Sequence, residues 1–251
     1  MSLADYYNKQ LRWRDWRTAM DALPEIRGKS ILDLGCGAGD QAALLTDRGA
    51  RVVGVDTNEE VLGAATARKL SGAQFINADL RSLPDAASLG APFDGLWSSF
   101  SAAYFVDLEP VLQTWASYVR PGGWIALIEI DDFFGHEPLA PRTRELLGTY
   151  AAEARASNRY DFYMGRKLSK VMSACGIRVD TELELADAEL AFNGNALPDV
   201  LDAWMTRLEW MTLLKTHCGS EFEAVRDDFL ACLGRADHRS ICRVMCCIGR
   251  Q

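Results

Sequence analysis

The stretch ILDLGCGAGD, residues 31–40, decides the fold, because it joins an apolar run to three closely spaced glycines. Gly35, Gly37 and Gly39 stand where a strand must turn into a helix, and without Cβ atoms their backbone can adopt positive φ and let a ligand come close. The helix that follows also presents free N–H groups. Asp33 lies inside the apolar run, just before the loop. Its charge disfavours a pyrophosphate at this loop and favours a cationic ligand.

Short apolar runs alternate with helical patterns on both sides of this loop as far as residue 130. Strands are expected at residues 30–34, 51–55, 74–77, 93–98 and 124–130. The clearest helix lies within residues 107–123, where Leu108, Leu112 and Trp115 share one face before Pro121-Gly122-Gly123 stops it. Strands separated by such helices pair in parallel through right-handed crossovers. This part of the chain therefore predicts a doubly wound α/β sheet, with its ligand beyond the carboxyl ends of the strands.

The regular alternation of short apolar runs with helical patterns ends after residue 130. Helical patterns are expected at residues 140–156, 165–175 and 197–216, an extended segment at 177–190 and a buried strand at 240–249. The two late strands would complete a seven-stranded, mostly parallel sheet around a helical insertion at about residues 190–235. We expect one domain over residues 1–251, made of an N-terminal segment (1–27), a ligand-binding core (28–130) and substrate-side elements (131–251).

The composition excludes several classes of protein. The formal net charge of −8 argues against a nucleic-acid partner, because such proteins usually carry a basic face. The seven cysteines form no CxxC pair, so neither a zinc site nor a disulfide framework is expected. The sequence shows no apolar leader and no stretch long enough to span a bilayer. These observations predict a soluble cytoplasmic protein with no membrane partner and no bound metal.

Two further carboxylates follow successive strands. Asp56 ends the stretch RVVGVD, where a doubly wound fold places an acid that can bind a ribose diol. Asp79, in FINADLRSLP, ends the next strand, where it can accept from an adenine amino group while Leu80 donates a backbone N–H. Any one of these acids alone is more often a helix cap or a surface charge. Three at successive strand ends, Asp33 included, indicate a single ligand crevice.

These motifs resemble those of class I S-adenosylmethionine-dependent methyltransferases, particularly the small-molecule type, over about residues 28–130. ILDLGCGAGD resembles the first motif of that family and VVGVDTNEEVLGAA its acidic second strand. INADLRSLP resembles the adenine-binding turn, FDGLWSSFSAAYF the fourth strand with its loop, and VRPGGWIALIE the helix-to-strand motif. All five come in the family's order and spacing, which is far more specific than the glycine loop alone.

The resemblance implies S-adenosylmethionine as cofactor, S-adenosylhomocysteine as product and a set of binding residues. They are Asp33, Gly35, Cys36 and Gly37 at the methionine part, Asp56 and Thr57 at the ribose, Asp79, Leu80 and Arg81 at the adenine, Ser98 near the sulfonium, and Tyr7 and Trp13 in an N-terminal lid. Packing of the two aromatic residues on the sheet edge is the alternative to a lid.

The sequence gives fewer indications of the residues that would bind or activate the methyl acceptor. A sulfonium is already a good leaving group, so the protein mainly aligns the nucleophile and excludes water. His136, just beyond the fifth strand, is the best candidate for a catalytic base, with Asp131 or Asp132 orienting it. Tyr104, in the loop after the fourth strand, is placed to reach the acceptor. A capped polar loop, or a divalent metal held by these acids with His136 and Glu137, are the alternatives, although the spacing fits no tight ligand set.

The late helical insertion carries Trp204 and Trp210, which either roof an apolar acceptor or pack in a core. The segment SSFSAAYF lacks the Asn-Pro-Pro-Tyr type of element that holds an exocyclic amine, which argues further against a nucleic-acid substrate. We therefore expect methyl transfer to a small organic acceptor, with secondary metabolism as the setting, in a monomer or homodimer. A cyclase on the same cofactor, a nicotinamide-binding oxidoreductase and a non-catalytic partner are the alternatives.

Overall fold

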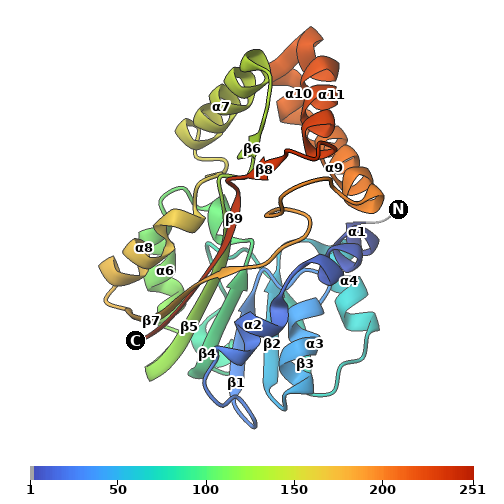
Figure 1. The fold of residues 1–251 in the computed structure, drawn as a ribbon. Coiled ribbons are helices and arrows are strands. Elements are labelled where there is room, and N and C mark those ends of the chain that lie inside the picture. Colours follow the sequence, from blue (N-terminus) through green and yellow to red (C-terminus); the bar gives the residue numbers. More distant parts are fainter. Residues whose placement is uncertain (1–2) are drawn as a thin grey trace.

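The computed structural model describes residues 3–251, apart from the side chains of residues 3, 4, 6 and 7. Its centre is a seven-stranded sheet of order β3-β2-β1-β4-β5-β9-β7 (Figure 1). The strands are β1 (Ser30–Leu34), β2 (Arg51–Asp56), β3 (Ala73–Asn77), β4 (Phe93–Ser99), β5 (Val119–Asp131), β7 (Arg178–Leu185) and β9 (Arg243–Arg250). Within this sheet β9 runs antiparallel to both of its neighbours, and the other strands are parallel. The predicted α/β fold is thereby confirmed.

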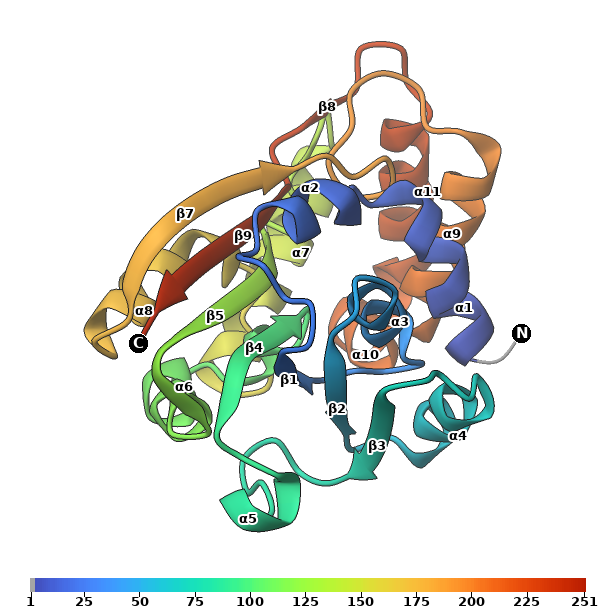
Figure 2. The same ribbon diagram turned by 90° about the horizontal axis from the view of Figure 1, so that it is seen from below.

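Helices cover both faces of the sheet, as the crossover connections require (Figure 2). One face packs against α2 (Trp16–Asp21) and α3 (Asp40–Asp47), which bury Trp16, Met20 and Leu45. The other face packs against α5 (Ala86–Leu89), α6 (Leu108–Ala116) and α8 (Leu168–Ala174). At the β3 end of the sheet, α1 (Leu3–Gln10) packs against α4 (Glu59–Ala67).

The predicted stop at Pro121-Gly122-Gly123 is wrong in one respect. The helix α6 already ends at Ala116, and β5 begins at Val119, so the three residues belong to a strand. Val119 pairs with Phe93, and the register of β4 with β5 shifts before the next pair. This irregularity accommodates Gly122, whose φ is +73°, in a strand that sequence patterning places further along the chain.

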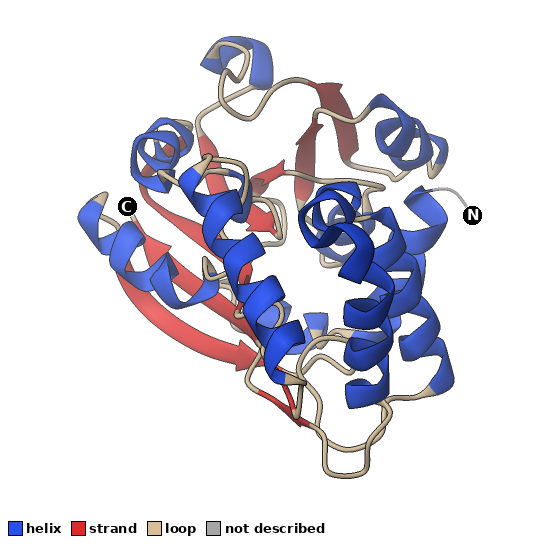
Figure 3. Ribbon diagram, turned by 90° about the horizontal axis from the view of Figure 1, so that it is seen from above, coloured by secondary structure: helices blue, strands red, loops and turns tan. Residues whose placement is uncertain are grey.

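A second layer covers the carboxyl ends of the parallel strands (Figures 1 and 3). We call it the cap; it consists of α7 (Pro141–Ala156), α9 (Pro198–Trp210), α10 (Thr212–Cys218), α11 (Phe222–Leu233) and the two-stranded sheet of β6 (His136–Glu137) with β8 (Arg239–Ser240). The expected late helical insertion is present as α9 to α11. The earlier helix α7 packs against α10 and α11, so the cap combines segments from both sides of β7.

The cap has its own aromatic core. Trp204 has no exposed surface, and its ring centroid lies 4.9 Å from that of Phe229 and 5.1 Å from that of Phe133. Its indole N–H donates to the carbonyl oxygen of Glu189 at 2.8 Å. Of the two alternatives for Trp204, core packing is therefore the one observed, and the acceptor-roof hypothesis is wrong for this side chain. Trp210, by contrast, is about half exposed.

Residues 11–15, which we call the strap, tie the N-terminal segment to the chain between β7 and α9. The strap includes the 3-10 turn η1 (Leu11–Trp13). The strap pairs with the chain that follows β7, because Asp15 N donates to Ala186 O at 3.0 Å and Ala188 N donates to Trp13 O at 2.8 Å. Across residues 3–251, no helix has both the length and the apolar character needed to cross a bilayer.

Candidate functional site

The loop between β1 and α3 has a backbone that only glycine adopts readily. Gly35, Gly37 and Gly39 have φ values of +76°, +51° and +77°. A Cβ on Gly35 would stand 1.8 Å from the hydroxyl oxygen of Ser101, in the segment after β4. Gly35 N donates to Val55 O at 2.8 Å, which folds the loop over the end of β2. The loop thus exposes bare backbone where β1, β2 and β4 end.

Asp33 is the buried acid of this loop. It is 1% exposed, and its Oδ2 has no hydrogen-bond partner. Burial, reinforced by the negative charges of Asp56 and Asp40, raises the pKa of Asp33 to about 8. A cationic group close to this carboxyl would supply the missing partner and favour its ionised form. The carboxyl is therefore suited to a positively charged ligand, as the sequence predicts.

Asp56 connects the glycine loop to the end of β2. Its Oδ2 accepts from Gly37 N at 2.9 Å, and its Oδ1 accepts from Asn58 N at 2.9 Å. The next residue, Thr57, is exposed, and its carbonyl oxygen accepts from Asn77 Nδ2 at 3.0 Å. The structure thus brings Asp33, the glycine loop and Asp56, which the prediction assigns to the methionine part and the ribose, next to one another. Because a carboxylate offers about four acceptor positions, Asp56 retains capacity for a diol.

The turn after β3 holds the predicted adenine residues. Asp79 is exposed and accepts from Arg81 N at 2.8 Å. Leu80 is buried, and its carbonyl oxygen accepts from Trp115 Nε1 at 2.8 Å, which fixes the turn on α6. Arg81 donates to Tyr104 O at 3.2 Å, so its guanidinium links this turn to the loop after β4. The assignment of the three residues to adenine stays a prediction.

Ser98 and Cys36 are both buried. The hydroxyl of Ser98 donates to Leu34 O at 2.9 Å, which ties β4 to β1. The predicted contact of the Ser98 backbone with a ligand stays a prediction. The Cys36 side chain is 2% exposed, and burial raises the pKa of its thiol far above the ordinary value. Cys36 is therefore a neutral packing residue beneath the loop.

Tyr104, a predicted acceptor residue, lies in a turn that is bonded to Glu129. Tyr104 lies in the 3-10 turn η2 (Ala102–Tyr104), is 54% exposed and packs edge-on against Tyr160 with centroids 4.9 Å apart. Glu129 on β5 is fully buried, and its Oε1 accepts from Ala103 N at 3.0 Å, so it fixes the turn that carries Tyr104. Burial raises the pKa of Glu129 to about 7. Sequence reasoning missed Glu129, although an acid within the apolar run IALIEI was an available signal.

The predicted pairing of Asp131 or Asp132 with His136 is wrong. Asp131 is fully buried and forms ion pairs with Arg166 and, at 2.6 Å, with Arg243. Asp132 also pairs with Arg166, at 3.2 Å. The two guanidinium groups take these acids because Asp131 and Asp132 end β5 beside β9, whereas the chain then turns away into the cap.

His136 lies inside the cap. It is 2% exposed, its Nδ1 is 3.0 Å from Nε2 of His238, and its ring packs edge-on against Trp204 and Phe229. Burial lowers the pKa of His136 to about 3. Its role as a base stays a prediction, and enclosure by cap residues argues against it. Among residues 3–251, no group of three or more histidine, cysteine, aspartate or glutamate side chains is arranged to hold a metal ion.

The predicted lid residues have different outcomes. Trp13 lies in the strap and is 7% exposed, packed in the core between sheet and cap. Tyr7 lies in α1, and its side chain is outside the described part of the structure. Asn8 of α1 accepts from Arg68 Nη2 at 2.6 Å, which anchors this helix on α4. The lid itself stays a prediction.

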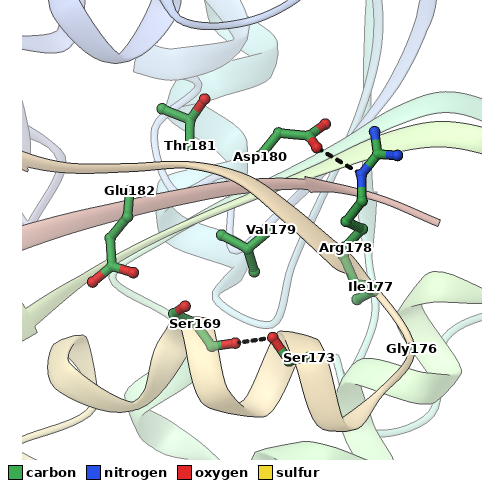
Figure 4. Close-up of a pocket in the computed structure, with 9 residues that line it drawn as sticks. All are labelled: Ser169, Ser173, Gly176, Ile177, Arg178, Val179, Asp180, Thr181 and Glu182. Atoms are coloured by element: carbon green, nitrogen blue, oxygen red, sulfur yellow. Dashed lines mark hydrogen bonds and ion pairs between the residues drawn. The ribbon is translucent and has the colours of Figure 1, made fainter.

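A pocket of about 670 Å³ lies elsewhere, between α8 and the edge strand β7 (Figure 4). Its lining includes Ser169, Ser173 and the chain from Gly176 to Glu182, where Arg178 and Asp180 form an ion pair at 2.8 Å. It is shallow and lies at the β7 edge, whereas the glycine loop follows β1 in the middle of the sheet. This pocket is therefore separate from the crevice formed by Asp33 and Asp56.

Comparison with known sequences concerns mainly the first half of the chain. Residues 31–123 match a family model described as a methyltransferase domain. The trans-aconitate 2-methyltransferase of Azoarcus sp. (strain BH72) is 33% identical over 143 residues, which cover 56% of this chain and 54% of that protein. The chain thus matches about half the length of such curated relatives.

Comparison with solved structures extends over almost the whole chain. The geranyl diphosphate C-methyltransferase of Streptomyces coelicolor A3(2), solved with Mg²⁺, geranyl diphosphate and S-adenosyl-L-homocysteine, has a TM-score of 0.55 at 17% identity, over 93% of this chain and 78% of that one. The [4+2]-cyclase SpnF has a TM-score of 0.61 at 15% identity, over 94% and 79%. At such identities the likeness establishes the fold.

Proposed function

We propose that this chain is a class I S-adenosylmethionine-dependent methyltransferase that transfers a methyl group to a small organic acceptor. The match of residues 31–123 to a methyltransferase domain, the curated relatives and the shared fold support this proposal. One observation carries this proposal: Oδ2 of the buried Asp33 has no hydrogen-bond partner, and it lies beside a glycine loop that Asp56 holds in place. That arrangement suits a ligand with a cationic end and a ribose, and such a ligand fits the residues present.

The cofactor, when bound, supplies a methyl group activated by its sulfonium. Asp33 accepts from the cationic end, Asp56 and Thr57 bind the ribose, and Asp79 with Leu80 holds the adenine. The bare backbone of Gly35 and Gly37 lets the ligand approach without steric conflict. These residues fix one reactant in place, which removes most of the entropic cost of an in-line displacement.

On the acceptor side, Tyr104 contributes an exposed phenol next to the crevice, and Glu129 keeps its turn in position. The cap covers the carboxyl ends of the strands and excludes water from the transfer. We place the acceptor among small organic molecules of secondary metabolism. The names of the relatives support an organic acid or an isoprenoid as the chemical type, because they act on trans-aconitate and geranyl diphosphate.

The setting we propose is cytoplasmic, with neither nucleic acid nor membrane as partner. All seven cysteines are free thiols, which suits a reducing compartment. The net charge of −8 disfavours polyanionic partners.

Calorimetric titration with S-adenosylmethionine, S-adenosylhomocysteine and NAD tests the cofactor. We expect micromolar binding of the first two ligands and a loss of about 1–3 kcal/mol in Asp56→Ala, because charge-assisted hydrogen bonds to the ribose disappear. Asp47→Ala, which removes an exposed acid at the far end of α3, is the matched control and keeps wild-type affinity. Binding of NAD alone contradicts the proposal.

A second candidate is a cyclase that uses the same fold, favoured by the structural likeness to SpnF. Mass spectrometry of acceptor mixtures with isotopically labelled S-adenosylmethionine separates the two. A labelled product supports methyl transfer, whereas cofactor binding with conversion of an acceptor at unchanged mass supports cyclisation.

A further inference from the structure

Three buried polar atoms without a hydrogen-bond partner lie on the same face of the sheet. They are Nε1 of Trp16, Nε1 of Trp97 and Oδ2 of Asp33. Both indole side chains are almost fully buried, with 5% of Trp16 and none of Trp97 exposed. Buried groups of this kind normally have partners, because an unmade hydrogen bond is costly. Two donors and one acceptor on one face therefore indicate a shared ligand.

The three side chains are neighbours in the fold. Asp33 on β1 stands directly opposite Trp97 on β4 in the parallel register, so both side chains emerge on the same face of adjacent strands. Trp16 of α2 covers that face, and its ring centroid lies 6.2 Å from that of Trp97. Asp33 also adjoins the glycine loop, because it is two residues before Gly35.

One arginine lies beside this corner. Trp16 packs edge-on against Phe100, with centroids 5.8 Å apart, and the guanidinium of Arg14 lies 4.5 Å over the same Phe100 ring. Arg14 already donates to Asp187 at 3.1 Å and to Glu189 at 3.2 Å. These two carboxylates compensate the charge of Arg14, so the donors without partners at this corner are the indole N–H groups.

A ligand that needs one acceptor for a cation and donors for an anion, side by side, is an α-amino acid. We propose that Trp16 and Trp97 donate their indole N–H groups to the carboxylate at the amino-acid end of the cofactor, while Asp33 accepts from its ammonium. This inference rests on the proposed function, which supplies the cofactor. It gives the indole groups a binding role, which neither the motif resemblance nor the comparisons assign to them.

The test compares ligands that differ only at the amino-acid end. S-adenosylhomocysteine carries both charges, its decarboxylated form keeps only the ammonium, and 5′-methylthioadenosine has neither. The variants Trp16→Phe and Trp97→Phe keep an aromatic ring and remove the N–H. For each we expect calorimetry to show an affinity for S-adenosylhomocysteine at least about tenfold lower, with the affinities for the other two ligands unchanged.

Trp204→Phe is the matched control, because its indole N–H is already bonded to Glu189 O within the cap. It should leave the affinity for all three ligands unchanged and lower the midpoint of thermal unfolding. Trp16→Phe and Trp97→Phe remove the same ring volume but a donor that lacks a partner, so without ligand each should lower the unfolding midpoint less than Trp204→Phe does.

The wild-type protein provides a readout that needs no variant to fold. The indole N–H resonances of Trp16 and Trp97 should shift downfield on addition of S-adenosylhomocysteine and stay in place with the decarboxylated form. Equal shifts with both ligands, or equal losses of affinity for S-adenosylhomocysteine and 5′-methylthioadenosine in the variants, overturn the inference and leave the proposed function intact. If the wild type binds none of the three ligands, the proposed function itself fails.

Discussion

At the scale of single residues, the burial of Asp33 without a counter-charge gives the free protein a specific pH dependence. The pKa of Asp33 is about 8 in the folded chain against 3.8 as its ordinary value. Between these pH values the folded state holds a proton that the unfolded state has lost. The free energy of unfolding therefore falls as pH rises from about 4 to 8.

Asp33→Asn removes this titration. Between pH 5 and pH 8, urea unfolding of the free wild type should show a loss of stability larger than that of Asp33→Asn by a few kcal/mol, on the order of magnitude that such a shift implies. Glu129, whose pKa is raised to about 7, contributes in the same direction to both proteins and cancels in the comparison. Parallel pH profiles would show that Asp33 is charged in the free protein.

Gly35 offers a second test at this scale. Gly35→Ala places a methyl group against Ser101 and forces positive φ on a residue with a Cβ, so we expect a loss of about 1–3 kcal/mol in stability together with loss of cofactor binding. Gly63→Ala, in the exposed middle of α4 where a Cβ meets nothing within 4 Å, is the control. It should stabilise the protein by about 0.5–1 kcal/mol and keep cofactor affinity. Chemical denaturation of both variants measures the change in stability, and calorimetric titration measures the change in cofactor affinity.

At the scale of elements, the cap depends on one aromatic side chain. Trp204→Ala leaves a cavity between Phe133 and Phe229, and we expect it to cost about 3–5 kcal/mol while cofactor affinity changes by less than about twofold. Trp210→Ala, on the same helix but half exposed, should cost less than about 1 kcal/mol. A large loss of cofactor affinity in Trp204→Ala would mean that the cap core supports the cofactor crevice directly.

The elements of the first 130 residues could be predicted because their signals are local. Apolar runs bounded by turn residues indicated the strands, and β1 lies at the predicted residues, 30–34. The pairing of β6 with β8 could not be predicted, because it joins His136 to Ser240 across most of the cap. The same long-range contact encloses His136, which sequence position alone placed at the crevice.

The candidate site also contains some residues that the sequence could predict and others that it could not. The glycine loop, Asp33 and Asp56 are recognisable because each follows or ends a strand. Trp16 and Trp97 had no local signal of function, since their significance depends on which neighbours they have or lack in three dimensions. Glu129 did have one, as an acid within an apolar run, but its contact with the turn that carries Tyr104 appears only in the structure.

At the scale of the whole molecule, buried charges hold the strap to the segment between β7 and α9. Arg14 pairs with Asp187 and Glu189, which are almost fully buried. Arg14→Ala leaves Asp187 without its cation, and we expect a loss of about 3–5 kcal/mol with faster hydrogen exchange of the amides at residues 186–191. Arg17→Ala, an exposed change one turn away, should alter neither. Unchanged hydrogen exchange in Arg14→Ala would show that the backbone hydrogen bonds of the strap are enough to hold residues 186–191 in place.

The position of β9 has a consequence for how the chain assembles on the ribosome. β7 pairs with β9 in the sheet, yet β9 is synthesised only after β7 and the late cap helices have emerged. Strands β1 to β5 can pair with one another as they leave the exit tunnel, whereas β7 has to wait for residues 243–250. The part of the sheet from β1 to β5, which carries the glycine loop, can therefore form first during translation. β7 joins this sheet only after β9 has been synthesised.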